Sequence, residues 1–359
     1  MSLSPVIVAA KRPPGHHDAR SDRQPCIRVN GGQLTTCQLR TVGELSRRYG
    51  RDVVAITGQQ HIRLRWTRVQ DVPAVIARLR AAGLSVVRAG DGASPAFIGS
   101  PVAGIAADEI IDGSPALRGI RERSAARAAL RGLPGKFRTT VSGSPRQDVL
   151  HEAGDVSFVG VCHPDLGPGF DVWIGAGLSA GPALAGRLGA FAALDEVPAV
   201  WAAIAGAYRD HGYRRPGRRD LLASLVTDRA AVKFRQVIET EYLHRPLADG
   251  PAPPPAWPRD HVGVHLQRDG RCYVGVTPSG ARARGSTLTG LADLAEAHGS
   301  TRVRATPYQK LIVLDIPPGR VESLCDGLER IGLTARPGLY RHRWTGTPTS
   351  EPYSTQEPS

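Results

Sequence analysis

The 359-residue sequence lacks paired cysteines, long apolar runs and, apart from four positions, lysine. No apolar stretch approaches the roughly 18 residues needed to span a bilayer. The N-terminus has a short apolar run before its basic residues, which is the wrong order for a signal peptide. We therefore expect a cytoplasmic protein with no membrane partner.

The cysteines are five isolated residues: Cys26, Cys37, Cys162, Cys272 and Cys325. Without a Cys-x-x-Cys or similar pair, neither a zinc ribbon nor a self-contained iron–sulfur site is predicted from the residues. Scattered thiols in odd number are typical of reduced, structural cysteines. No metal ligand set is predicted.

The formal net charge is +13, and 42 of the 46 basic residues are arginine. A positive charge favours anionic partners such as an acidic protein or a ligand with several carboxylates. A bias of the genome toward arginine explains the composition equally well. No zinc-finger, RNP-like or basic-helix pattern is present, so nucleic acid is not an expected partner.

The sequence contains an internal repeat: residues 39–84 align without a gap onto residues 288–333. Identical pairs include Leu45/Leu294, Gly50/Gly299, Val54/Val303, Thr57/Thr306, Gln60/Gln309, Leu79/Leu328, Gly83/Gly332 and Leu84/Leu333. Because one register is kept through both glycine pairs and both Thr-x-x-Gln elements, we interpret the repeat as a duplication.

Each copy has the same predicted elements. In the first copy the apolar spacing predicts a helix over 39–50, a strand over 53–56, an alternating strand over 62–66 and a helix over 72–83. Two strands and two helices make an α+β half-domain of ferredoxin-like character. One such unit leaves an apolar face bare, so the two copies are expected to pack together.

The residues between the copies form a different α+β segment. We predict strands over 156–161 and 170–175, and helices around 182–192, 194–210, 217–226 and 230–243. The predicted organisation is a flexible segment 1–26, a first half-domain 27–95, a central domain 96–245, a proline-rich linker 246–259, a second half-domain 260–337 and a disordered tail 338–359.

Several stretches, in order, resemble the ferredoxin-dependent sulfite/nitrite reductase family, most closely its actinobacterial type. They are GGQLTTCQLRTVGELS (31–46), TGQQHI (57–62), GSPVAGIAADEIID (99–112), LPGKFR (133–138), HPDLGPGFDVWIGAGLS (163–179), LDEVPAVWAAIAGAYRDHGYRR (194–215), KFRQVIETEYL (233–243), RDHVGVHLQRDG (259–270) and ATPYQKLIVLDIP (305–317). A more distant resemblance is to precorrin-3B synthase. The fold implied is two ferredoxin-like half-domains, packed together, that flank a reductase-type α+β domain.

The resemblance also implies an activity and its cofactors. Members of the family hold a sirohaem beside a [4Fe-4S] cluster and use electrons from ferredoxin to reduce sulfite to sulfide or nitrite to ammonia. Such chemistry requires cationic side chains near the bound oxyanion, and the carboxylates of the ring require arginine or lysine partners. Sulfite or nitrite is thus the expected small-molecule ligand, and ferredoxin the expected partner.

Matching the family motifs assigns candidate site residues. Lys136 and Arg138 match two basic residues of the family and are candidate oxyanion contacts. Gln59 and Pro95 stand at the two positions where the family has arginine, so half of the expected oxyanion-binding charge is absent.

Four further residues are candidates for sirohaem binding: Gln60, Arg63, Arg65 and Gln309. A solvated strand face is an equally good interpretation of the two arginines. Hydrogen bonds that stabilise turns are the favoured interpretation of the two glutamines. Trp66, Trp173 and Trp201 are interpreted as core residues.

The C-terminal region departs from the family pattern. After the second half-domain the family continues with a Cys-x5-Cys pair, a third domain and a Cys-x3-Cys pair, and none of these follows residue 337 here. We therefore expect a C-terminally truncated member without the cysteine ligands of the cluster. Three hypotheses remain: a reductase that is impaired or needs a cluster-bearing partner chain, a non-catalytic binding module, and a protein of tetrapyrrole biosynthesis.

Overall fold

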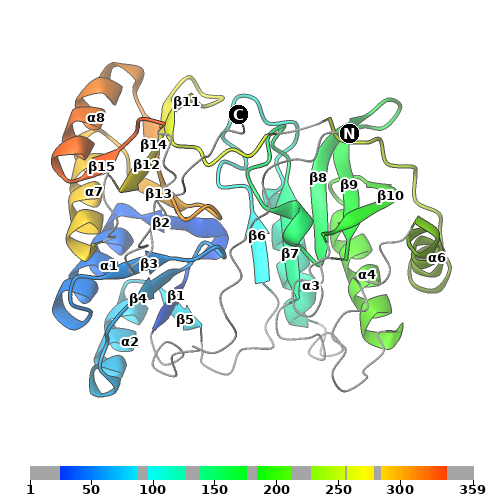
Figure 1. Cartoon of the computed structure of the whole chain (residues 1–359), viewed down its shortest axis with the longest axis horizontal. Helices are drawn as coiled ribbons and strands as arrows, with labels where there is room; N and C mark the ends of the chain where they lie inside the picture. The colour runs from blue at the N-terminus through cyan, green and yellow to red at the C-terminus, as the bar shows by residue number, and fades with distance from the viewer. Residues whose placement is uncertain are drawn as a thin grey trace, which may run out of the picture.

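The structure is a computed structural model that describes residues 25–87, 96–126, 137–175, 184–211, 228–254, 257–278 and 284–337. The predicted tail, the helix predicted at 217–226 and all but two residues of the predicted N-terminal segment lie outside the described residues. The described part is α+β, with the two half-domains at the left of Figure 1 and the central domain at the right.

The first half-domain is a small antiparallel sheet backed by two helices. Its strands are β1 (Cys26–Arg28), β3 (Val54–Ile56), β4 (Ile62–Leu64) and β5 (Ser85–Val87), in the order β3-β4-β1-β5. Helices α1 (Thr36–Tyr49) and α2 (Val72–Ala81) cover one face. Helix α1 begins with a capping box, in which Thr35 and Gln38 each bond the other's backbone N–H.

The second half-domain has a larger sheet, in the order β11-β12-β14-β13-β2 with β15 paired to β12. Its own strands are β11 (Gly263–Leu266), β12 (Cys272–Pro278), β13 (Arg302–Ala305), β14 (Leu311–Ile316) and β15 (Leu333–Thr334), backed by helices α7 (Gly285–Ala297) and α8 (Val321–Arg330). Strand β2 (Gln33–Thr35) comes from the first copy and pairs with β13. The two copies therefore share a sheet as well as a core.

The pairing register confirms the duplication. Cys26 pairs with Arg63 in the first sheet, and Gly275 pairs with Ile312 in the second, each 249 residues further along the chain. Left-handed backbone also recurs at that offset, with φ 61° at Gln60 and 62° at Gln309. Equal register and equal dihedrals over such a separation indicate one scaffold used twice.

A single apolar core joins the two copies. It contains residues of both sheets and of all four helices, including Ile27, Leu39, Leu79, Val303 and Leu328. Helices α1, α2, α7 and α8 lie together along the outer left side of the molecule (Figure 1). The expectation that each copy buries the other's bare face is confirmed.

The central domain is a five-stranded mixed sheet in the order β10-β9-β8-β7-β6. Its strands are β6 (Ala96–Gly99), β7 (Arg138–Ser142), β8 (Val156–His163), β9 (Gly167–Ile174) and β10 (Gly186–Ala192), of which β6, β7 and β8 run parallel. The helices are α3 (Ser114–Ala126), α4 (Val197–His211) and α6 (Asp228–Val237), with a π-helical segment at Ile238–Leu243. Trp201, fully buried, is at the centre of this core and donates to Thr139 Oγ1 at 2.8 Å.

One predicted helix of the central domain is wrong. Residues 182–192 were expected to be helical, but Gly186–Ala192 is strand β10, paired with β9. The small residues of this stretch fit both the helical and the strand periodicity. Gly189, however, has φ 73°, which is incompatible with a helix. Arg187 fixes the pairing because it reaches across to the buried Asp171, with 2.7 Å between Nε and Oδ2.

The proline-rich segment after residue 245 packs against the central sheet. Leu247 is buried, and Ala190 of β10 forms a β-bridge with Asp249. None of the described helices is both long and apolar enough to cross a membrane.

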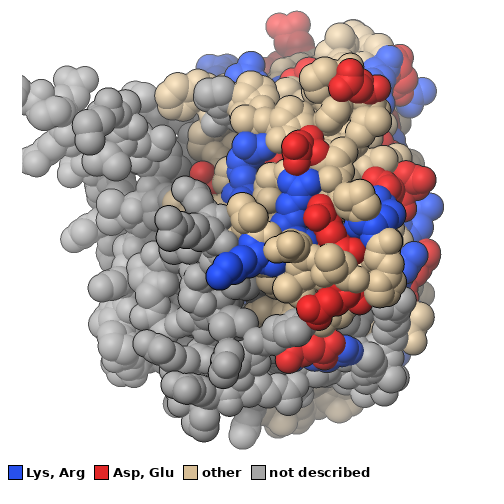
Figure 2. Space-filling view, turned by 90° about the vertical axis from the view of Figure 1, so that its right-hand side faces the viewer, with Lys and Arg blue, Asp and Glu red and all other residues tan. Residues whose placement is uncertain are grey.

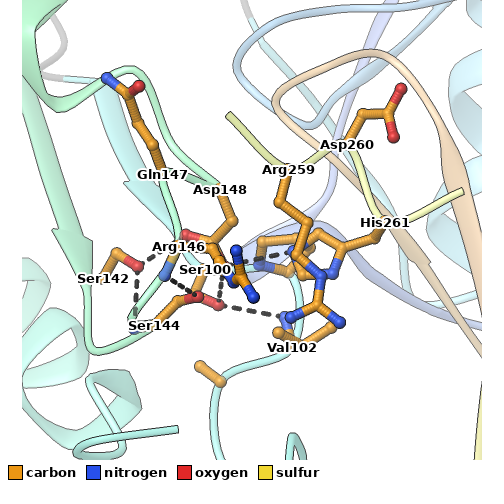
Figure 3. Close-up of polar contacts among 12 residues, drawn as sticks. Ser100, Val102, Ser142, Ser144, Arg146, Gln147, Asp148, Arg259, Asp260 and His261 are labelled. Atoms are coloured by element: carbon orange, nitrogen blue, oxygen red, sulfur yellow. Dashed lines mark hydrogen bonds and ion pairs between the residues drawn. The ribbon is translucent and has the colours of Figure 1, made fainter. Parts of the chain in front are cut away.

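A buried polar network joins the central domain to the second half-domain (Figure 3). Asp148 accepts hydrogen bonds from Ser100 Oγ and Ser142 Oγ, both at 2.6 Å, and its Oδ2 lies 3.4 Å from His261 Nε2. His261 Nδ1 in turn lies 3.1 Å from the hydroxyl of Tyr273 on β12. Because these side chains are all buried, the network fixes how the central domain sits against the second sheet.

Candidate functional site

The face of the first sheet that is turned away from its helices is cationic. Ile62 and Leu64 of β4 are buried in the shared core, so the residue between them, Arg63, points to the opposite face. Cys26 of β1 lies directly opposite Arg63 in the ladder. Burial raises the pKa of the Cys26 thiol, and the neighbouring Arg63 only partly offsets this.

Charge from the central domain joins this face. Burial lowers the pKa of His61 to about 4, and the charges of Arg28 on β1 and Arg121 on α3 lower it further. Burial also lowers the pKa of Arg121, with Arg28 adding to the effect. Arg63 lies across the ladder from Cys26, on the strand that carries Arg28, and the charges of Arg28 and Arg121 act on His61. We call Arg28, His61, Arg63 and Arg121 the cationic face.

The duplicated sheet shows that the fold itself does not require arginine at the positions of Arg63 and Arg65. In the second copy Ile312 and Leu314 stand where the first has Arg63 and Arg65. Both are fully buried and packed against Val102 and Ala106 of the central domain. One face of the scaffold is thus closed by the protein's own side chains, and its duplicate is lined with arginine.

The cationic face fits a ligand with several negative charges. Among the described residues, neither Arg63 nor Arg121 has a carboxylate within ion-pair distance. The Nε atom of Arg63 is buried and has no hydrogen-bond partner within the described part of the chain. A buried guanidinium donor without a partner costs free energy, and a bound carboxylate or oxyanion would remove that cost.

The predicted oxyanion contacts are only partly within the described residues. Lys136 and Pro95 lie outside them. Arg138 begins β7, where its backbone N–H donates to Asp155 Oδ2 at 2.7 Å and its guanidinium donates to Ala153 O at 2.8 Å. Gln59 is exposed in the turn between β3 and β4. The role of these four residues stays a prediction.

The two glutamines of the repeat form reciprocal hydrogen bonds between the copies. Gln60 Nε2 donates to Ala305 O at 3.1 Å, and Gln309 Nε2 donates to Ile56 O at 2.8 Å. Gln60 Oε1 also accepts from the backbone N–H of Gly99 in the central domain, at 3.3 Å. The side chains link three parts of the fold, and their predicted role in sirohaem binding stays a prediction.

Of the aromatic residues predicted in the core, Trp201 is buried, Trp173 is half-buried, and Trp66 is not in the core. The alternating pattern extends to Trp66, but β4 ends at Leu64 and Trp66 adopts left-handed backbone at φ 60°, with half of its surface exposed. Arg65, between the strand end and this turn, is half-buried.

Sequence reasoning missed Arg28, His61 and Arg121. Arg28 is on the strand that pairs with β4, where Arg63 is opposite Cys26, 37 positions earlier in the chain. Arg121 comes from a helix of another domain. No local sequence pattern predicts the position of Arg28 or of Arg121 relative to the first sheet. The available signal for Arg28 was its position in a short alternating stretch, Cys26–Arg28, ahead of two glycines.

The thiols do not gather in the described part of the chain. Cys37 and Cys162 are exposed, Cys272 is buried, and the other two are half-buried. Within the described ranges no three histidine, cysteine or carboxylate side chains are placed to hold a metal ion.

Comparison with protein families gives two matches that together cover most of the chain. Residues 96–247 match the nitrite and sulphite reductase 4Fe-4S domain. Residues 26–82 and 265–331 each match the nitrite/sulfite reductase ferredoxin-like half domain. The chain belongs to the nitrite and sulfite reductase family, and its two half-domains and central domain are those of that family.

Individual relatives and a solved structure indicate the same family. The chain is 45% identical over 316 residues to sulfite reductase [ferredoxin] 2 of Mycolicibacterium paratuberculosis, which covers 88% of this chain and 57% of the relative. It is 31% identical over 349 residues to the assimilatory ferredoxin-dependent nitrite reductase of Haloferax mediterranei, covering 90% and 57%. The solved structure of the NirA protein of Mycobacterium tuberculosis superposes with a TM-score of 0.80 at 44% identity, covering 88% of this chain and 58% of that one. The chain therefore spans a little over half the length of these relatives.

Proposed function

We propose that this chain is the sirohaem-holding part of a ferredoxin-dependent sulfite reductase, and that the cationic face is where it holds the ring. The observation that carries the proposal is the arginine lining of the first sheet, at positions where the duplicated sheet has Ile312 and Leu314. Sirohaem carries several carboxylates, which suit arginine partners. Bound there, it would supply the iron centre for the six-electron reduction.

The chain's own residues have defined tasks in this proposal. Arg63 and Arg121 would bind ring carboxylates or the substrate oxyanion through charge-assisted hydrogen bonds. His61 is neutral near pH 7 because burial and the charges of Arg28 and Arg121 lower its pKa to about 4. An anion bound beside it would oppose those two charges and raise the pKa toward the range in which imidazole holds and delivers protons.

Sulfite is favoured over nitrite because relatives with sulfite reductase names are 44–45% identical to this chain, and those with nitrite reductase names are 30–32% identical. We also propose that the [4Fe-4S] cluster is bound by residues outside these 359. The cluster needs about four cysteine thiolates, and the five cysteines here neither pair in the sequence nor gather in the described part.

A non-catalytic tetrapyrrole-binding module is the second candidate. It is favoured by Gln59 and Pro95, which stand where the family has arginine and so remove charge near the oxyanion while leaving Arg63 and Arg121 for the ring. Both candidate functions use the cationic face to bind the ring, but only the reductase would turn over sulfite.

Reconstitution with sirohaem tests the shared part of the proposal. We expect the purified chain to bind sirohaem and develop a Soret band with a red-region band. Arg63→Ala combined with Arg121→Ala should weaken binding by about tenfold or more, since each charge-assisted hydrogen bond contributes roughly 1.5–3 kcal/mol. The readout is a spectrophotometric titration.

The matched control is Arg118→Ala, an exposed arginine one turn away on the same helix as Arg121, which should bind sirohaem like the unmodified chain. A chain that stays colourless after reconstitution contradicts the proposal. Binding of an iron-free precursor ring in preference to sirohaem would instead support tetrapyrrole biosynthesis.

A further inference from the structure

Trp66 lies on the surface, where two adjoining loops contain residues with left-handed backbone. It is 51% exposed, and its ring lies 5.3 Å from the guanidinium carbon of Arg51. Arg51, Asp52 and Trp66 have φ of 53°, 59° and 60°, a region that non-glycine residues rarely adopt. A large aromatic side chain is therefore held in water, at some conformational cost.

The second copy shows that the scaffold does not need this tryptophan. Asp315 stands at the position of Trp66 and has the same left-handed backbone, φ 61°. It is mostly buried and ion-paired to Arg302, with 2.6 Å between Nε and Oδ2. The left-handed backbone at this position thus belongs to the shared fold, whereas the exposed ring and its arginine neighbour belong to the first copy alone.

The surroundings of Trp66 are mainly basic. Asp52 is the only carboxylate between Leu45 and Gln70, and its two oxygens accept from Ser286 N and Oγ, both at 2.7 Å. Arg284 is next to this contact because it forms a β-bridge with Val53. We call the exposed residues of these loops the Trp66 patch: Arg48, Arg51, Trp66, Arg68, Val69 and Arg284.

The charged surface at the far end of the central domain is internally paired among its described residues. Figure 2 shows the far end of the central domain, where basic and acidic side chains alternate. There Arg235 pairs with Glu239 and Asp249 at 2.9 and 2.7 Å, and Arg245 with Glu196 at 2.6 Å. That end therefore pairs its basic side chains with acidic ones, whereas the Trp66 patch contains four exposed arginines.

We propose that the Trp66 patch is the docking surface for the electron donor, an acidic protein of the ferredoxin class. Exposed arginines around one rigid aromatic ring are the residue types that anchor protein interfaces, and a basic patch attracts an acidic partner. A single ring suits a protein better than a nucleic-acid strand, whose successive bases need successive rings. The choice of ferredoxin rests on the proposed function.

The position of the patch agrees with this role. Trp66 is three residues beyond Arg63 in the chain, just past the end of β4, so the Trp66 patch adjoins the strand that contributes Arg63 to the cationic face. A protein bound there would lie next to the proposed sirohaem site.

Binding of a purified, negatively charged actinobacterial ferredoxin to the full chain, measured by calorimetry in about 50 mM salt, tests the inference. We expect Arg51→Glu combined with Arg68→Glu to raise Kd about tenfold or more, and Trp66→Ala to raise it about fivefold. The matched control is Arg118→Glu combined with Arg330→Glu, the same charge change at two exposed arginines on other elements, which should change Kd less than about twofold.

Unchanged ferredoxin affinity in the R51E/R68E variant, or no binding by the unmodified chain, would overturn the inference. So would binding of a single-stranded oligonucleotide that depends on Arg51 and Arg68 while ferredoxin binding does not. Sirohaem titration of the same variants separates the two proposals. R51E/R68E should retain sirohaem binding, and ferredoxin binding by a chain that takes up no sirohaem would refute the proposed function alone.

Discussion

Glu109 is a buried carboxyl group in the loop between β6 and α3. Its Oε2 accepts from the backbone N–H of Gly104 at 2.8 Å and lies 3.4 Å from Arg268 Nη2, whereas its Oε1 is buried with no hydrogen-bond partner in the described part of the chain. Burial raises the pKa of Glu109 to about 7, which the Gly104 N–H opposes and the nearby Asp112 reinforces. The folded protein therefore holds a proton there that the unfolded chain releases near pH 4.5.

The raised pKa of Glu109 predicts a pH-dependent stability. Between about pH 4.5 and pH 7 the folded state binds more protons than the unfolded state, so this group's contribution to the free energy of unfolding falls as pH rises. Glu109→Gln lacks that titration. We expect the free energy of unfolding of the variant, relative to the unmodified chain, to increase by about 1–3 kcal/mol from pH 5 to pH 8.

Urea denaturation of both proteins at the two pH values measures the difference. Asp165→Asn, at an exposed carboxylate, is the control and should show no such change. A constant difference between Glu109→Gln and the unmodified chain would mean that Glu109 ionises normally in the folded state.

Among the secondary-structure elements, α1 and α7 pack at a crossing made close by glycine. A Cβ atom added at Gly43 would lie 2.5 Å from Gly285 O and 2.5 Å from Thr289 Oγ1. The reverse holds at Gly285, whose added Cβ would lie 2.6 Å from Gly43 O. The two copies therefore meet through backbone at this point, and no larger side chain fits without moving a helix.

Gly43→Val should destabilise the protein by about 2 kcal/mol or more, because overpacking at a helix crossing forces the backbone apart. Gly290→Ala, on α7, is the matched control. A Cβ there would lie 3.4 Å from Ile331, so the variant should be neutral or slightly stabilising through its better helix propensity. Thermal unfolding would distinguish them, and equal melting temperatures would disprove the close crossing.

For the whole molecule, the duplicated scaffold and the central domain supply a cationic face, but the cysteines needed for a cluster are not assembled in the described part. We expect the purified 359-residue chain, loaded with sirohaem, to show less than about 1% of the sulfite reduction of a full-length relative when methyl viologen supplies electrons. The control is addition of a cluster-bearing segment of a relative, which should raise the rate. Turnover by the chain alone would refute the proposal that the cluster is bound elsewhere.

Several features were predictable because they are local or repeated. The sequence repeat itself gives the offset between the copies. The spacing of apolar residues predicts the helices found at 36–49 and 72–81 and the strands found at 156–163 and 167–174. The family follows from motifs in order. The helix wrongly predicted at 182–192 shows the limit, because alanine and glycine fit either period and only the pairing with β9 decided the matter.

The sequence by itself determined the duplicated α+β scaffold and the family, because both can be inferred from short-range patterns and from identical residues at one offset. Only the tertiary structure decided that β2 leaves its own copy to join the other sheet, that Arg121 of α3 lies within electrostatic range of Arg28, and that Trp66 faces water. These outcomes depend on contacts between residues that are distant along the chain. The energy of such contacts is set by what packs against each face, and a linear pattern does not record it.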